Sequence, residues 1–215
     1  MTYATLGALL VHYVRQRDLE GKQELYKKSL WTDTRALLDE FVEYMEDDNL
    51  ESYSTNCLNV GYPSRTWQRV KVVANMGDRM MCTLMSRALF FMNAWGRQST
   101  KGANTDPQNE ELKEHIRCAI VNIFMYILLA SPCKSTMGID NAWYTVKQME
   151  ESMGGLIKQG KCGHGVFENI QTQEFDMAKK IQAWMCHYIQ IGTVRPRAMC
   201  PQGSYKEDIF HSPSI

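Results

Sequence analysis

Two short segments near the end of the chain hold residue types that bind zinc. Cys162 stands two positions before His164, and Cys186 is followed directly by His187. Thiolate and imidazole groups are preferred zinc ligands, so a loop and a helix could present four of them to one ion. Adjacent residues on a helix point about 100° apart, however, so Cys186 and His187 would seldom reach the same metal. A small zinc-dependent protein stays an alternative, and we expect no metal and no other cofactor.

No motif for nucleophilic catalysis or nucleotide binding accompanies these residues. A cysteine protease needs cysteine, histidine and a polar orienting residue, and the chain contains these types without a nucleophile motif. There is no GxSxG or HExxH sequence, and Gly154-Gly155 lies in no phosphate-binding context of lysine, serine and strand. We therefore expect a protein that is not an enzyme and that has no catalytic residues.

The seven cysteines are the most informative residues of the chain. No two stand at the CxxC spacing of zinc ribbons or thioredoxin-like motifs, so they either cross-link an extracellular domain or remain reduced and buried. We expect Cys200 to be unpaired. The six candidate disulfide cysteines are Cys57, Cys82, Cys118, Cys133, Cys162 and Cys186.

Helix geometry favours particular cysteine pairs. A continuous helix after Cys118 would end about 18 Å away, too far for Cys133 to return, because a disulfide needs Cα atoms within about 7 Å. An antiparallel pair of helices would instead bring Cys82 level with Cys118, and this is the first pair that we predict. Cys162 and Cys186 could then link the loop after the fifth helix to the sixth helix, while Cys57 and Cys133 would both lie in connections and are left as the remaining pair.

Length, charge and hydropathy exclude several classes of protein. The 215 residues are 44% hydrophobic, and 24 basic residues balance 24 acidic ones, so one sizeable core forms and no overall field attracts nucleic acid. The longest apolar run, residues 119–130, is shorter than the roughly 20 residues of a membrane span. The mildly apolar start of the chain is interrupted by His12 and lacks the basic residues of a signal peptide. We expect no nucleic-acid partner and no membrane contact by this segment.

Apolar residues recur at the helical period along most of the chain. This pattern predicts an all-α fold, an irregular bundle of about six helices cross-linked by disulfides, with no convincing strand. Asp106 followed by Pro107 marks the start of what should be the central helix. The predicted helices cover residues 2–17, 32–47, 67–95, 106–130, 140–153 and 174–191. The third of these helices could be interrupted at Gly77. We expect one domain at residues 1–192 and an extended or disordered tail at residues 193–215.

The methionines of the third predicted helix allow two interpretations. Methionine repacks easily against different partners, so a row of them could line an adaptable binding groove. Helical spacing favours a place in the core, and the same holds for the tryptophans, with Trp67 close to a loop. The methionines are Met76, Met80, Met81, Met85 and Met92.

Several short segments follow one another in an order typical of one family, from about Leu6 to Cys186. They are Leu30-Trp31, Leu37-Leu38, Tyr44-Met45, Cys57, Met81-Cys82, residues 87–93 (RALFFMN), His115-Ile116-Arg117-Cys118 and Cys133. In this combination the chain resembles the N-terminal alpha domain of the SICA antigens, the schizont-infected-cell agglutination variant antigens of Plasmodium parasites. The segment around residues 161–165 and the tail match nothing in the family, so the last cysteines and any binding residues are not carried over.

The resemblance implies part of a large, cysteine-rich protein that is exported to the surface of the infected erythrocyte without a conventional signal peptide. Its membrane anchor would belong to an absent C-terminal part. We therefore expect host-facing binding and antigenic variation, with a host receptor or antibodies as partners. Loops at residues 47–63, 96–105 and 134–140 would make the contacts. The alternative is an intracellular helical adaptor or scaffold with reduced cysteines, which would bind a partner helix in an amphipathic groove.

Overall fold

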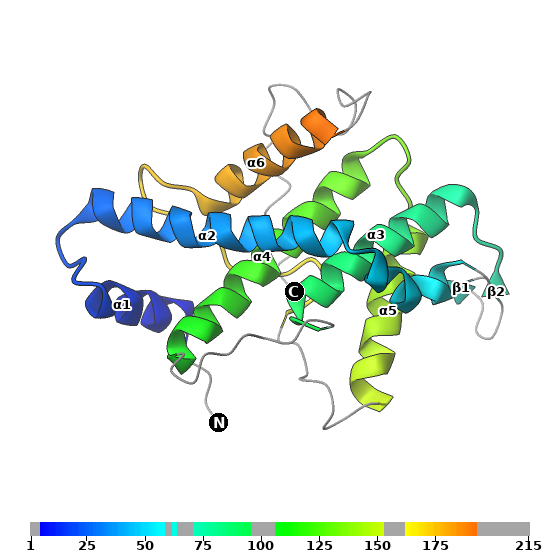
Figure 1. Ribbon diagram of the computed structural model, residues 1–215, viewed down its shortest axis with the longest axis horizontal. Helices are drawn as coiled ribbons and strands as arrows, with labels where there is room; N and C mark the ends of the chain where they lie inside the picture. Colours follow the sequence, from blue (N-terminus) through cyan, green and yellow to red (C-terminus); the bar gives the residue numbers. More distant parts are fainter. Residues whose placement is uncertain (1–4, 59–61, 64–70, 96–105, 153–161, 193–215) are drawn as a thin grey trace, which may run out of the picture.

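The fold is all-α, as the hydrophobic pattern predicts, with six α-helices among the described residues (Figure 1). The computed structural model describes residues 5–58, 62–63, 71–95, 106–152 and 162–192. The helices are α1 (Leu6–Gln16), α2 (Gln23–Glu46), α3 (Met76–Met92), α4 (Pro107–Ala130), α5 (Thr136–Ser152) and α6 (Met177–Gly192). A 3-10 helix, η1 (Asp48–Cys57), and two short strands, β1 (Tyr62–Pro63) and β2 (Lys71–Val72), lie between α2 and α3.

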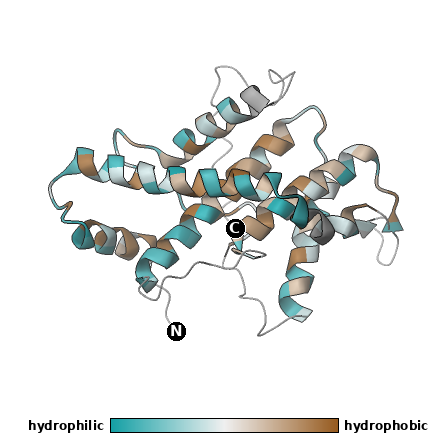
Figure 2. Cartoon of the chain, in the orientation of Figure 1, coloured by the Kyte–Doolittle hydropathy of each residue, from teal (hydrophilic) through white to brown (hydrophobic). Residues whose placement is uncertain are grey.

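The helix α4 is the centre of the fold. Asp106 accepts a hydrogen bond from the backbone N–H of Gln108, and Pro107 takes the first helical position, as the sequence predicts. Figure 2 shows that α4 changes from a hydrophilic start to a hydrophobic second half. Residues 118–125 are all buried, because α1, α2, α3 and α6 pack around this helix. Among the described residues, no helix combines the length and hydropathy that a membrane crossing requires.

The helices α3 and α5 come into close backbone contact at Gly138. A Cβ atom added to this glycine would lie 2.2 Å from the backbone carbonyl oxygen of Asp78. The Asp78 carboxylate is buried there and accepts hydrogen bonds from the Ser135 hydroxyl (2.6 Å) and from the backbone N–H of Asn75 (2.8 Å). The Asn75 side chain in turn accepts from the N–H of Asp78, which completes a capping box at the start of α3.

Two helices begin earlier than the sequence predicts, and the residues expected to cap them lie inside the helices. In α2, which begins at Gln23, the Thr32 hydroxyl donates to the Lys28 carbonyl oxygen (2.9 Å), and the Asp33 carboxylate pairs with Arg17 (2.8 Å). In α5, the Ser135 hydroxyl accepts from the N–H of Gly138 (2.9 Å) and acts as the cap, five residues before Asp140.

The connection between α2 and α3 differs from the predicted loop at residues 47–63. The Asp47 side chain accepts from the N–H of Asn49, and a 3-10 helix follows as far as Cys57. The prediction of no strand is wrong for β1 and β2, which pair antiparallel with Tyr62 opposite Val72. Met76, rather than Trp67, begins α3; Trp67 lies outside the described residues, as do the predicted loop at residues 96–105 and the predicted tail at residues 193–215.

The close contact at Gly138 gives a test of the packing of α3 against α5. We expect Gly138→Ala to lower the free energy of unfolding by about 2 kcal/mol, because the added methyl group overpacks a backbone contact. The control is Gly7→Ala in α1, where an added Cβ meets nothing within 4 Å and should stabilise the helix by about 0.5 kcal/mol. Guanidinium unfolding of both oxidised variants measures this, and equal effects at the two sites would contradict the close approach.

Candidate functional site

Two disulfides attach segments between the helices to α3 and α4. Cys57 at the end of η1 bonds to Cys82 in α3 (Cα–Cα 5.6 Å), and Cys118 in α4 bonds to Cys162 in the segment before α6 (Cα–Cα 5.5 Å). The predicted pair Cys82–Cys118 is therefore wrong. The two cysteines lie at similar heights along their helices, but the rotation of each helix about its axis points the sulfurs in different directions. The Cys82 sulfur lies beside Asn141 of α5, whereas the Cys118 sulfur lies beside the backbone of Val166.

The other predicted pairs change with this one. Cys162 bonds to Cys118 and not to Cys186, and Cys57 bonds to Cys82 and not to Cys133. Cys133 is free and exposed, so its place among the disulfide cysteines is a wrong prediction. It follows the end of α4 at an exposed turn. Cys186 is disulfide-bonded, and Cys200 lies outside the described residues.

The predicted zinc ligands have structural contacts instead. The sulfur of Cys162 is used by the disulfide, so it offers no thiolate to a metal. The His164 ring stacks on Trp143 of α5, with ring centroids 5.1 Å apart. In the part of the chain that the structure describes, no three histidine, cysteine or acidic side chains gather as metal ligands would.

Asn122 attaches the Cys162 segment to α4, and sequence reasoning missed it. Its buried amide NH₂ donates toward the Cys162 sulfur (3.2 Å), and its amide oxygen accepts from the N–H of Gly165 (2.7 Å). The Tyr126 hydroxyl, one turn on, donates to the Gly165 carbonyl oxygen (3.1 Å). The sequence feature that could have identified Asn122 is a single amide inside an apolar run. A buried amide needs hydrogen-bond partners for both its NH₂ group and its oxygen.

The contact around Cys57 is fixed in the same way by Tyr62. The tyrosine is 1% exposed, and its hydroxyl donates to the Cys57 carbonyl oxygen (3.0 Å). Burial raises the pKa of Tyr62 to about 12, with a smaller contribution from the nearby Asp78 charge. The hydroxyl therefore remains a donor at every physiological pH.

The methionines of α3 divide into two groups. Met81, Met85 and Met92 are buried in the core, which confirms the favoured interpretation for these three. Met76 is 86% exposed and Met80 is 40% exposed, so the favoured interpretation, a place in the core, is wrong for these two.

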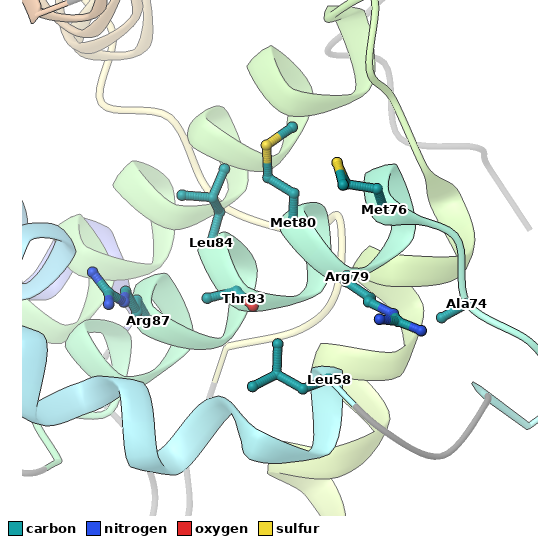
Figure 3. Close-up of a pocket in the computed structure, with 8 residues that line it drawn as sticks. All are labelled: Leu58, Ala74, Met76, Arg79, Met80, Thr83, Leu84 and Arg87. Atoms are coloured by element: carbon teal, nitrogen blue, oxygen red, sulfur yellow. The ribbon is translucent and has the colours of Figure 1, made fainter.

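Met76 and Met80 line an open hollow of about 670 Å³ on the outer face of α3 (Figure 3). In the figure they lie with Leu84 along one side of α3, and Leu58 lies on the facing segment beyond Thr83. We call this hollow the α3 groove; its lining residues are Leu58, Ala74, Met76, Arg79, Met80, Thr83, Leu84 and Arg87.

The two arginines of the α3 groove have different surroundings. Arg87 is partly buried, and its guanidinium donates to the Met45 carbonyl oxygen (2.6 Å) in the last turn of α2. A cation at a helix C-terminus is favourable, so Arg87 stabilises the end of α2. Arg79 is exposed. The sequence analysis identified neither arginine as a functional residue. The sequence did contain a signal for the groove itself, because this helix has two apolar stripes, one inward and one outward.

Where the structure describes them, the loops predicted to make contacts with partners are partly helical and partly buried. Within residues 47–58, Leu50 and Ser54 are buried against the core. Residues 134–140 are mainly the first turn of α5, with Gly138 and Ile139 buried, so this segment is not a loop that varies freely. The tryptophans of the described residues pack in or against the core, as predicted; they are Trp31, Trp95, Trp143 and Trp184.

Comparison with protein families gives one match over most of the chain. A model of the SICA extracellular alpha domain matches residues 12–184. The matched range begins within α1, ends within α6 and includes the α3 groove and the disulfides Cys57–Cys82 and Cys118–Cys162. Comparisons with curated proteins and with solved structures find no match.

The disulfides give a test of the framework around the groove. We expect the double variant Cys57→Ala/Cys82→Ala to lose about 3 kcal/mol of unfolding free energy, because the bond closes a loop of 25 residues. Cys133→Ser is the control and should change it by less than about 0.5 kcal/mol. Denaturant unfolding and non-reducing peptide mapping measure both points. A peptide linking Cys82 to Cys118, or an equal loss in the Cys133 variant, would refute this arrangement.

Proposed function

Because the chain belongs to the SICA extracellular alpha domain family, we propose that it is a host-facing, non-catalytic domain of a variant surface antigen on the infected erythrocyte. The observation that carries this proposal is the family match over residues 12–184. In this proposal the partners are a host receptor or antibodies, and the membrane anchor belongs to another part of the full-length protein.

The disulfides support an extracellular location. Disulfides persist in oxidising compartments and are rare in cytosolic proteins, where thiols are kept reduced. Cys57–Cys82 and Cys118–Cys162 are both buried or partly buried cross-links between separate elements, and Cys186 is bonded as well. A reduced intracellular adaptor would have to hold these cysteines as thiols, so the disulfides favour the surface antigen.

The architecture suits a protein whose surface changes while its fold does not. The core is formed by α4 and the helices around it, and the disulfides fix η1 and the Cys162 segment to this core. Exposed substitutions usually change stability by less than about 0.5 kcal/mol, so exposed side chains can differ among antigens without loss of folding. Tyr144, 52% exposed on α5, and Val166, 62% exposed, are examples of such positions.

Labelling of intact cells tests the proposed location. Antibodies raised against the oxidised 215-residue chain should label live, non-permeabilised erythrocytes infected by a parasite that expresses it, as measured by flow cytometry. Trypsin treatment of the intact cells should abolish the signal. Uninfected cells and antibodies adsorbed with the folded chain are the controls. Labelling that requires permeabilisation would reject the surface antigen and favour the intracellular adaptor.

A further inference from the structure

We propose that the α3 groove binds an acidic amphipathic helix of a partner protein. The inference deepens the proposed function by naming a partner class. The inference rests on the proposed function for one point, the location of the partner outside the erythrocyte. The chemistry of the partner is inferred from the groove alone.

The outer face of α3 consists of two parallel rows of side chains. Met76, Met80 and Leu84 stand four residues apart and form an apolar row, because residues at this spacing lie on one side of a helix. The neighbouring row has the same spacing and holds Arg79, Thr83 and Arg87. An apolar row therefore lies beside a row that begins and ends with a cation.

The apolar row is accessible to a partner. Met76 is 86% exposed and Met80 is 40% exposed, and Leu58 across the groove is 41% exposed. Neighbouring exposed apolar side chains with a polar border mark interaction sites, and methionine adapts its shape to the surface that covers it.

The charge of the groove selects an acidic partner. Its eight lining residues include two arginines and no carboxylate. The acidic residue of α3, Asp78, is 5% exposed, and its two carboxylate oxygens accept from Ser135 and Asn75 on the inner side. A guanidinium has five N–H donors, so Arg87 retains donors beyond the one bonded to Met45. Carboxylates are the matching acceptors, in charge-assisted hydrogen bonds.

The spacing of the arginines sets the length of the partner segment. Arg79 and Arg87 are eight residues apart on one helix, which corresponds to about 12 Å along its axis. A partner helix would match them with two acidic residues about two turns apart, and would place its apolar stripe on Met76, Met80 and Leu84. A symmetric pair of α3 helices from two copies would bring arginines close to arginines, so the groove does not favour a second copy.

Peptide binding to the oxidised 215-residue chain tests the proposal. The probe is a fluorescent helical peptide with leucines along one face and two glutamates beside that face, as far apart as Arg79 and Arg87. One control peptide has lysines in place of the glutamates, and another has the glutamates a single turn apart. Anisotropy titrations at low and moderate salt should show saturable binding of the probe that weakens with salt, and binding at least about tenfold weaker for both controls.

Variants locate the binding. We expect Arg79→Glu and the double variant Met76→Ser/Met80→Ser to weaken probe binding by about tenfold or more, with unchanged thermal unfolding. The matched controls lie on α1: Arg15→Glu, whose side chain is 72% exposed, and Val11→Ser, where the residue is 51% exposed; both should leave binding unchanged.

Four results would overturn the inference. They are absence of saturable binding, equal binding of the lysine peptide, equal loss in the α1 variants, and a dimer in sedimentation experiments that the groove variants dissociate. The last result would assign the face to a second copy. Cell labelling does not depend on the groove, so failure of peptide binding with intact labelling rejects this inference alone.

Discussion

Burial of residues 118–125 of α4 on every side is the constraint on which the rest of the structure depends. An isolated helix with a continuous apolar run cannot stay in water, and residues 118–125 are covered because α1, α2, α3 and α6 all pack on this one helix. The polar group within that run, Asn122, then needs partners, and it finds them in the Cys162 segment. The Cys118–Cys162 bond forms in the same place, so core packing, the amide contacts and the cross-link all support one arrangement.

The features that the sequence predicts well are those determined by local chemistry. Asp106 and Pro107 mark the start of α4, and its apolar run indicates a central helix, because capping and burial depend on a few adjacent residues. The start of α2 was harder to predict, since Thr32 and Asp33 have the chemistry of caps but lie inside the helix. There Lys28 of α2 satisfies Thr32, and Arg17 at the end of α1 satisfies Asp33. A capping residue in a sequence thus indicates a helix end only where no partner arrives from elsewhere in the fold.

Cysteine pairing could not be predicted for a related reason. The spacing of Cys82 and Cys118 sets their height along two helices, but the rotation of each helix decides which neighbour a sulfur meets. That rotation follows from contacts such as Gly138 against Asp78, which hold α3 on α5 and direct Cys82 toward η1. The resemblance to the SICA family, carried by the order of whole segments, does not depend on such rotations, and the family match over residues 12–184 confirms it.

The two groups of methionines on α3 show how one helix can have a structural and an exposed role. Its inner side holds Met81 and Met85 in a core that resists change, because well-packed positions lose stability when a side chain changes volume. Its outer side holds Met76 and Met80, whose substitution affects few contacts of the fold. Cys82 fixes the same helix to η1, so the outer row keeps a defined position relative to Leu58. A surface that changes among antigens can therefore be carried on a rigid helix as well as on loops, with its geometry set by the core beneath it.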